Sequence, residues 1–265
     1  MRKVVDLLTT LLRSPNEFWT RAASSIEVRL ESAMRPRVDY QIQPWDKVLS
    51  QIGEVLQVEL ASYMVEPALK RIEQSVRGGL ESIPGDAPFP SFHNGDFRVA
   101  RLCYALVRAL APNSVVETGV CYGVTSSFIL AALEQNGSGQ LYSIDMPPLG
   151  DKTNAFVGLL VPKEFRGRWE LSIGPSKDVL PGLLARIRTV EMFLHDSKHT
   201  YRNIWRELNT VSPRLARRSF VVADDVEGNS AFLQWVGNCK PTYWAAVGQE
   251  NKHSLMGIAA FAGER

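Results

Sequence analysis

The fold is decided by the stretch Ser114-Val115-Val116-Glu117-Thr118-Gly119-Val120-Cys121-Tyr122-Gly123-Val124-Thr125-Ser126, in which a short apolar run leads directly into a helical pattern. Gly119 and Gly123 let the chain turn tightly and let its backbone approach a ligand. The helix that follows presents unpaired N–H groups in its first turn, where a carboxylate or phosphate can bind. The glycine spacing is G-x-x-x-G and not the G-x-G-x-x-G of dinucleotide-binding loops. A tight turn without a ligand is the alternative for this stretch alone.

Apolar runs and helical patterns alternate on both sides of this stretch. The runs cover residues 114–118, 140–146, 169–173, 190–194, 219–223, 242–247 and 255–261, and the helical patterns cover 98–110, 125–135, 177–188, 201–208 and 230–236. Such alternation is typical of a parallel sheet covered on both faces. The last two runs leave no room for a helix between them. We therefore predict an α/β fold, a Rossmann-like sheet of seven mostly parallel strands that ends in an antiparallel hairpin.

The first 90 residues differ from the rest of the chain, because their pattern is helical without alternating apolar runs. Ser14-Pro15-Asn16-Glu17 has the pattern of a capping box, and Arg35-Pro36-Arg37 breaks the helix that it begins. A second helical stretch, in one or two pieces, covers 45–77 and is predicted to end at Gly78-Gly79, before a proline-rich linker at 83–90. We divide the chain into a helical N-terminal extension, 1–90, and the sheet domain, 91–265. The extension is expected to form a lid, a substrate wall or an oligomer contact, with Trp19 and Trp45 as core or interface anchors.

Composition excludes several classes of protein. The chain has 265 residues, 30 Lys and Arg against 28 Asp and Glu, and 45% hydrophobic residues. A net charge of +2 argues against a protein that wraps nucleic acid. No apolar run reaches the about 18 residues of a membrane span, and the N-terminus lacks the features of a signal peptide. The three cysteines form neither a disulfide framework nor a zinc pattern. We expect a soluble, cytoplasmic protein that binds neither nucleic acid nor membrane.

An acidic residue ends the second predicted strand. Asp145 follows Gly119 by 26 residues, close to the spacing at which an acid accepts hydrogen bonds from a ribose diol. A helix cap or a solvated loop is the alternative for Asp145 alone, but the glycine loop and the acid together indicate a ligand that contains a nucleoside. Glu117 lies directly before the turn, where an acid suits a cationic ligand better than a pyrophosphate.

Residues 117–125 with Asp145 resemble the cofactor site of class I S-adenosylmethionine-dependent methyltransferases, in particular small-molecule O-methyltransferases. The resemblance covers about residues 97–264. It implies S-adenosylmethionine as cofactor, with its methionine part at the Gly119 loop, its carboxylate at Thr125, its ribose at Asp145 and its sulfonium near Glu117. Ser172, Gly174 and Ser176 would line the adenine. The expected cofactor-binding residues are Glu117, Thr118, Gly119, Tyr122, Gly123, Thr125, Ser126, Asp145, Gly174, Ser176 and Asp196.

Three further acids follow the fourth and fifth predicted strands. Asp196 precedes Asp224 and Asp225 by 28 residues or more, and neighbouring parallel strands would bring all three to one edge. Carboxylates this close repel one another unless a cation lies among them. Oxygen ligands suit Mg²⁺, Ca²⁺ or Mn²⁺. We therefore predict a divalent metal site at Asp196, Asp224 and Asp225, and the alternative is a set of loop acids and helix caps.

His199 follows Asp196 by three residues, where a neutral imidazole could accept a hydroxyl proton. A solvent-exposed position at the start of a helix is its alternative, and His93, His195 and His253 are expected to be structural. The pattern D-x-x-H followed by Val221-Val222-Ala223-Asp224-Asp225 is similar to that of metal-dependent O-methyltransferases of bacterial sugar and natural-product pathways. That resemblance implies Mg²⁺ at the acids, with His199 and Asp196 as catalytic residues. Lys198 departs from the pattern, in which an acid is common.

These observations favour a Mg²⁺-assisted O-methyltransferase that acts on a hydroxylated small molecule, a sugar or a natural product, as a possible homo-oligomer. A nicotinamide-dependent oxidoreductase is the second hypothesis, although the absent G-x-G-x-x-G counts against it. The third is a pathway protein that binds the cofactor without turnover. A nucleic-acid methyltransferase is disfavoured by the near-neutral charge.

Overall fold

A computed structural model describes residues 15–34, 38–149 and 153–263, and within them it contains one seven-stranded sheet in the order β3-β2-β1-β4-β5-β7-β6. The strands are β1 (Ser114–Thr118), β2 (Gln140–Asp145), β3 (Trp169–Ile173), β4 (Val190–His195), β5 (Leu215–Ala223), β6 (Tyr243–Gly248) and β7 (Leu255–Ala262). The first five run parallel, whereas β7 is antiparallel to both β5 and β6. The predicted fold class is confirmed. β5 begins earlier than predicted, at Leu215, which pairs with Val190 of β4.

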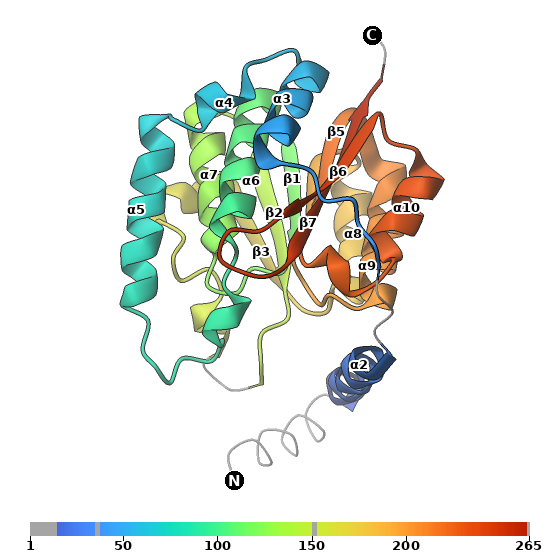
Figure 1. Cartoon of the computed structure of the whole chain (residues 1–265). Helices are drawn as coiled ribbons and strands as arrows, with labels where there is room; N and C mark the ends of the chain where they lie inside the picture. Colours follow the sequence, from blue (N-terminus) through green and yellow to red (C-terminus); the bar gives the residue numbers. More distant parts are fainter. Residues whose placement is uncertain (1–14, 35–37, 150–152, 264–265) are drawn as a thin grey trace.

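The helices cover both faces of the sheet (Figure 1). They are α2 (Pro15–Met34), α3 (Trp45–Leu56), α4 (Leu60–Tyr63), α5 (Pro67–Glu81), α6 (Phe97–Leu110), α7 (Val124–Asn136), α8 (Ser176–Ile187), α9 (Tyr201–Val211) and α10 (Ala231–Cys239). Successive residues of a strand face opposite sides. In β1, Val115 packs with α3 to α7, and Val116 packs with α8 to α10. All five residues of β1 are buried, as expected for a central parallel strand.

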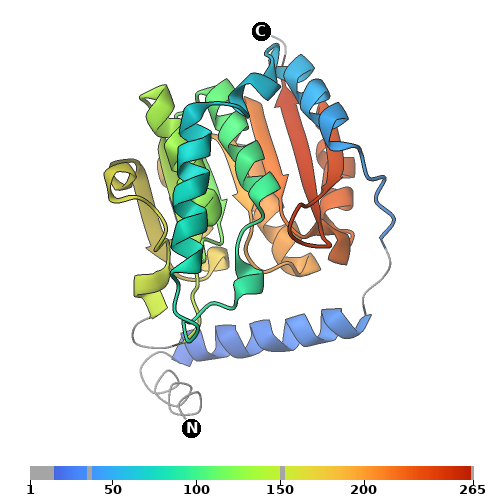
Figure 2. The same ribbon diagram turned by 60° about the vertical axis from the view of Figure 1, so that its left-hand side comes forward.

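The N-terminal extension has two structurally different parts. Helices α3 to α5 contribute Val48, Ile52 and Ile72 to the same core as the sheet. Helix α2 instead lies across the end of the sheet (Figure 2). Trp45 packs against the core, whereas Trp19 is 65% exposed and belongs to no core. The capping serine, Ser14, and the break at residues 35–37 lie outside the described residues.

The predicted helix end at Gly78-Gly79 is wrong, because α5 continues to Glu81. A Cβ atom on Gly79 would lie 2.5 Å from Cδ2 of Leu160. Gly79 therefore serves close packing inside the helix and not termination.

The register of the sheet determines where the site forms. Thr118 lies opposite Ile144 of β2 and His195 of β4, and His195 lies opposite Ala223 of β5. The residues that follow these strands therefore share one edge, which is where ligands bind in open α/β sheets.

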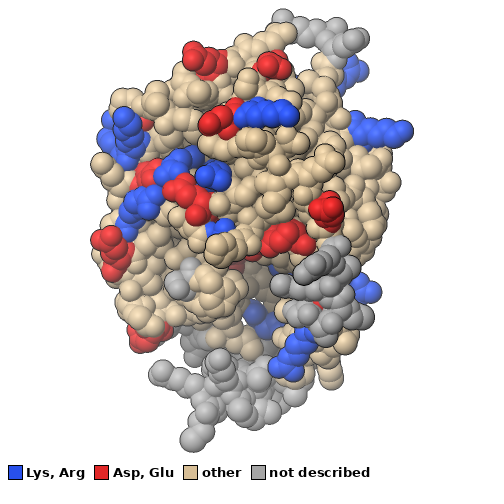
Figure 3. Space-filling view, viewed as in Figure 1, with Lys and Arg blue, Asp and Glu red and all other residues tan. Residues whose placement is uncertain are grey.

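Charged side chains of both signs are interspersed on the face shown in Figure 3. Several form ion pairs, such as Arg101 with Glu73 and Glu250 at 2.6 and 2.5 Å. None of the described helices is both long and apolar enough to cross a membrane.

Candidate active site

The glycine loop after β1 packs directly against the loop after β4. Gly119 has φ +87°, and a Cβ atom there would lie 1.9 Å from the carbonyl oxygen of Asp196. Gly123 also has φ +87°, and its Cβ atom would lie 2.8 Å from Cα of Gly158. Side chains at these positions would push both neighbouring segments away. The loop predicted to bind the cofactor and the loop that carries Asp196 are thus parts of one packed unit.

Asp145 is tied to the glycine loop from the end of β2. Its Oδ2 accepts hydrogen bonds from the backbone N–H groups of Val120 and Cys121 at 2.6 and 2.9 Å. Burial raises the pKa of Asp145, and the two N–H groups oppose that shift. The sequence-based prediction that the acid and the loop meet agrees with this geometry.

Glu117 is buried beneath the same loop with half of its carboxyl group unpartnered. Oε2 accepts hydrogen bonds from the hydroxyls of Ser126 and Ser143, each at 2.7 Å. Oε1 is buried without a partner among the described residues. Burial raises the pKa of Glu117 to about 8, against the two serine hydrogen bonds. Glu117 therefore carries a proton at neutral pH, and a cationic ligand nearby would favour its release.

The first turn of α7 offers a position for a negatively charged group. No side chain of the described residues caps this helix at Gly123. The hydroxyl of Thr125 is buried and also lacks a partner there. Free N–H groups and an unpartnered hydroxyl at a helix N-terminus suit a carboxylate.

The hydroxyl groups of three residues predicted to bind the cofactor form hydrogen bonds within the protein instead. Thr118 and Ser176 both donate to the buried carboxylate of Glu207 on α9, Thr118 at 2.6 Å. The hydroxyl of Tyr122 bonds the backbone of Phe89, donating to its oxygen at 2.9 Å and accepting from its N–H at 3.1 Å. Alternation along β1 explains Thr118, since Thr118 and Glu117 point to opposite faces of the sheet.

Glu207 was not singled out in the sequence. Besides Thr118 and Ser176, it accepts hydrogen bonds from Ser197 at 2.9 Å and Asn203 at 3.1 Å, and it contacts Nδ1 of His195 at 2.6 Å. These partners come from β1, β4, α8, α9 and the loop after β4, so Glu207 ties the segments around Asp196 together. An acid on the buried face of a predicted helix is the signal that could have identified it, because buried acids are rarely left unpaired.

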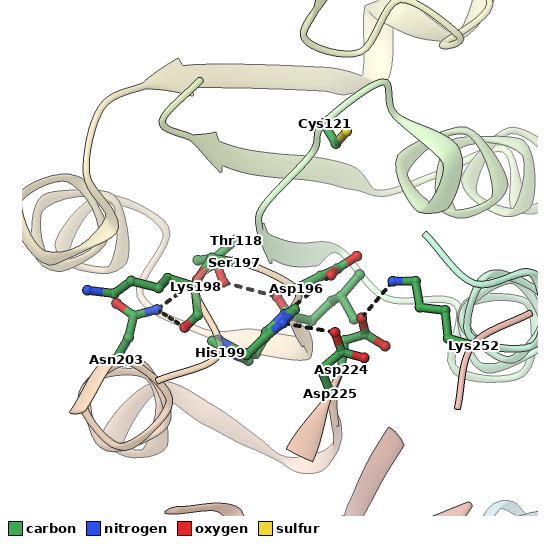
Figure 4. A network of polar contacts seen from close by, with 12 residues as sticks. Thr118, Cys121, Asp196, Ser197, Lys198, His199, Asn203, Asp224, Asp225 and Lys252 are labelled. Atoms are coloured by element: carbon green, nitrogen blue, oxygen red, sulfur yellow. Dashed lines mark hydrogen bonds and ion pairs between the residues drawn. The ribbon is translucent and has the colours of Figure 1, made fainter. Parts of the chain in front are cut away.

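Two of the three acids after β4 and β5 lie close together, and a histidine joins them (Figure 4). One ligand atom from each of Asp196, His199 and Asp224 lies within 4.8 Å of the others. Asp225 instead faces the imidazole, with its Oδ2 at 3.1 Å from Nδ1 of His199. Nε2 of His199 lies 3.6 Å from Oδ1 of Asp196. The backbone of Asp225 is left-handed, with φ +50°, a conformation that aspartate tolerates better than most residues.

The electrostatics of this cluster are dominated by its negative charges. Burial raises the pKa of Asp224 well above its ordinary value, and Asp196 and Asp225 raise it further. Burial disfavours a charged His199, but the carboxylates around it outweigh that effect and raise its pKa to about 10. The interaction with His199 holds the pKa of Asp225 low, against its burial. In this state His199 carries a proton at neutral pH and is an acid, not a base.

Lys198, which departs from the motif, binds helix α2. Its Nζ lies 2.7 Å from Oε2 of Glu27, whose Oε1 accepts from the hydroxyl of Thr200 at 2.6 Å. Glu31 accepts from the N–H of Tyr201 at 2.7 Å. Further along α2, Arg21 donates to the carbonyl oxygen of Pro147 at 2.8 Å. The helix therefore lies over the strand ends, next to the acid cluster.

The loop between β6 and β7 adds residues that the sequence did not indicate. Gln249 donates to Oδ1 of Asp224 at 2.6 Å, and Nζ of Lys252 lies 3.7 Å from Oδ2 of Asp224. His93, expected to be structural, lies where burial and the charges of His199 and Lys252 lower its pKa. The predicted hairpin contained a usable signal, since a β7 antiparallel to β5 brings its preceding turn to the same edge as Asp224.

Solved structures with this fold include methyltransferases. An O-methyltransferase from Bacillus cereus in complex with SAH has a TM-score of 0.53 at 11% identity and covers 81% of this chain and 97% of its own. The O-methyltransferase TomG from Streptomyces achromogenes, in complex with SAM and involved in tomaymycin synthesis, has a TM-score of 0.51 at 16% identity. It covers 75% of this chain and 91% of its own. The SAH-bound methyltransferase PaMTH1 from Podospora anserina has a TM-score of 0.51 at 10% identity and covers 84% of this chain and 99% of its own. At these identities the likeness shows the fold.

Residues 116–226 match a protein family described as a methyltransferase domain. Over these residues, which make up less than half of the chain, the sequence is similar to that domain. The match spans the glycine loop, Asp145 and all three acids, so the predicted enzyme class, an S-adenosylmethionine-dependent methyltransferase, is confirmed. No curated protein sequence matches the chain. The matched residues thus include the edge of the sheet where Gly119 meets Asp196.

The buried Glu117 predicts a specific dependence of stability on pH. Between its ordinary pKa of 4.5 and the folded value of about 8, the folded protein binds more protons than the unfolded chain. The free energy of unfolding should therefore fall as pH rises through this interval, by up to about 5 kcal/mol. In Glu117→Gln, this part of the pH dependence should disappear, as measured by urea unfolding at pH 5, 6.5 and 8.

The exposed Glu54 supplies the matched control, since Glu54→Gln should keep the wild-type pH profile. A Glu117→Gln variant with the wild-type slope would show that Glu117 is ionised in the folded protein.

Proposed function

We propose that this protein is an S-adenosylmethionine-dependent O-methyltransferase that methylates a hydroxyl of a small molecule, a sugar or a natural product. The observation that carries the proposal is the contact of Gly119 with Asp196, which brings the glycine loop and the acid cluster to one point. The O-methyltransferases of this fold, with SAH or SAM bound, support the choice of cofactor and of oxygen as acceptor atom.

The cofactor is assigned to polar groups that have no hydrogen-bond partner among the described residues. Thr125 and the first turn of α7 suit the methionine carboxylate, and the Oε1 of Glu117 suits a positively charged neighbour. Asp145 would accept hydrogen bonds from the ribose. The members of the predicted set in or next to the glycine loop are Glu117, Gly119, Gly123, Thr125, Ser126 and Asp145. We keep Gly174 as a backbone contact after β3, where its N–H donates to the backbone oxygen of Asp145.

Calorimetry with S-adenosylhomocysteine tests the cofactor, with NADH as the competing ligand. We expect micromolar binding of S-adenosylhomocysteine alone, and a loss of at least about tenfold in Asp145→Asn, since the carboxylate proposed to accept from the ribose is lost. The exposed Asp86 in the linker provides the control, Asp86→Asn. Binding of NADH alone would instead favour the oxidoreductase, and binding of neither would reduce the glycine loop to a structural turn.

Methyl transfer requires a positioned and deprotonated hydroxyl. S-adenosylmethionine, when bound, would supply the methyl group and retain the electrons of its carbon–sulfur bond, and His199 would accept the proton that the acceptor hydroxyl loses. Asp225 lies 3.1 Å from Nδ1 of His199, whereas Nε2 lies 3.6 Å from Asp196 and has no hydrogen-bond partner among the described residues. Because His199 is protonated when only carboxylates surround it, the base role requires added positive charge nearby.

The donor set fits a hard divalent ion. Asp196 and Asp224 offer carboxylate oxygens, and the Oδ2 of Asp224 is buried without a hydrogen bond. A bound Mg²⁺ would supply that positive charge and a site for the acceptor oxygen. We assign Asp196 and Asp224 to the metal and Asp225, predicted as a third ligand, to the orientation of His199.

Removing both proposed ligands should abolish turnover without abolishing cofactor binding. In the double variant Asp196→Asn, Asp224→Asn we expect transfer of labelled methyl to fall by at least about a hundredfold, the scale of a lost acid–base or electrostatic contribution. The assay uses a panel of phenolic and sugar acceptors in magnesium buffer, with S-adenosylhomocysteine calorimetry on the same sample. Full activity in the double variant would refute the metal role. Wild-type cofactor binding with no transfer to any acceptor would favour a protein without turnover.

Helix α2 is proposed as a wall of the acceptor site, through Glu27 and its contacts to Lys198 and Thr200. Its exposed apolar residues Trp19, Ile26 and Leu30 are 65%, 58% and 56% exposed and support a homo-oligomer contact on its outer side. Helix α2 would then combine two of the roles expected for the extension, a substrate wall and an oligomer contact.

Weakening the Glu27 contacts should loosen α2. In Glu27→Gln the ion pair with Lys198 is lost, and trypsin should cleave at the exposed Arg29 about fivefold faster, as measured by mass spectrometry of the fragments. Glu54→Gln should show the wild-type rate. An unchanged rate in Glu27→Gln would mean that Glu27 does not hold the helix in place.

A further inference from the structure

A lysine reaches the acid cluster from outside the methyltransferase motifs. Lys252 lies on the loop between β6 and β7, and its Nζ lies 3.7 Å from Oδ2 of Asp224. The lysine side chain is 20% exposed and that of Asp224 only 1%. Figure 4 shows the ammonium group directed at Asp224, on the opposite side of the cluster from Lys198.

Among the described residues, two cationic side chains contact the cluster, and each contacts different acids. His199 contacts Asp196 and Asp225, whereas Lys252 contacts Asp224. The Oδ1 of Asp224 already accepts a hydrogen bond from Gln249, on the same loop as Lys252. Its Oδ2 receives no hydrogen bond from the described residues, so the ammonium group compensates this oxygen by charge alone.

A buried carboxylate beside two others needs positive charge nearby. Because Oδ2 of Asp224 receives no hydrogen bond from the described residues, it is also the oxygen of this carboxylate that is open to a divalent ion. An ion there and the ammonium group would lie close together in a partly buried site, where like charges repel strongly and salt screens them poorly.

We propose that Lys252 is a tethered cation that stabilises the acid cluster in the absence of metal and competes with a divalent ion for Asp224, so that it sets the metal affinity of the site. This inference rests on the metal site of the proposed function but not on methyl transfer or on the identity of the acceptor. It gives the β6–β7 hairpin a part in the site, as the segment that supplies both partners of Asp224.

The test is Lys252→Met, which keeps the length of the side chain and removes its charge. We expect Mn²⁺ to bind this variant at least about tenfold more tightly than the wild type, as measured by calorimetry and by the electron paramagnetic resonance signal of free Mn²⁺. Without metal, the melting temperature should fall by about 2–4 °C, since Asp224 loses its counter-ion. Added Mn²⁺ should restore more stability to Lys252→Met than to the wild type.

Two variants control the experiment. Lys252→Arg keeps the charge and should bind Mn²⁺ like the wild type, and Lys70→Met removes an exposed charge on α5 and should change neither affinity nor melting temperature. Should Lys252→Met fail to fold, Lys252→Gln answers the same question.

Equal Mn²⁺ affinity in the wild type and in Lys252→Met would overturn the inference, and so would an unchanged melting temperature without metal. Binding of Mn²⁺ to neither protein would overturn the competition together with the metal site. S-adenosylhomocysteine binding, measured on the same samples, separates that result from a failure of the proposed cofactor.

Discussion

The contact between the backbone of Gly119 and the carbonyl oxygen of Asp196 is the constraint on which the site depends. It follows from the register of the sheet. Thr118 lies opposite His195, so the residues that follow them, Gly119 and Asp196, meet at the edge. The N–H of Asp196 donates to the oxygen of Thr118, and that of Asp224 donates to the oxygen of His195, both at 2.8 Å. Backbone hydrogen bonds thus position the acids before any side chain contributes. A side chain at residue 119 would separate the proposed cofactor loop from the proposed catalytic loop.

Glu207 supports this arrangement from below the edge. It is fully buried, and its charge is compensated by hydrogen bonds from several segments and by contact with His195. A buried carboxylate with this many donors retains its charge and orders the groups that bind it. The loop that carries Asp196 and His199 is therefore held on one side by Glu207 and on the other by Gly119, while α2 contacts it from outside through Lys198.

The charge of the acid cluster connects the proposed chemistry with the rest of the molecule. Three carboxylates raise the pKa of His199 and so keep it protonated. To act as a base, His199 needs nearby cations that offset these negative charges. The chain itself supplies one cation from the β6–β7 hairpin, and the donor set accommodates another. Lys198 does not take part in this compensation, because Glu27 neutralises it outside the cluster. The departure from the common motif is thereby explained as a contact to α2.

The sequence by itself determined the fold class and the edge where the site forms. Alternating apolar runs specify parallel strands, and the residues after parallel strands must share an edge, so Glu117, Asp145, Asp196 and Asp224 could be placed together from their positions alone. Only the tertiary structure decided which way each polar side chain points and what it meets. Thr118 turned to Glu207 because neighbouring strand residues face opposite sides of the sheet. Glu27, Glu207 and Lys252 joined the site from segments far apart in the chain, through contacts that depend on how helices and hairpins pack. The sequence can mark such a residue as a buried acid or as part of a hairpin turn, but the segments that it contacts are set by distances between elements and not by spacing along the chain.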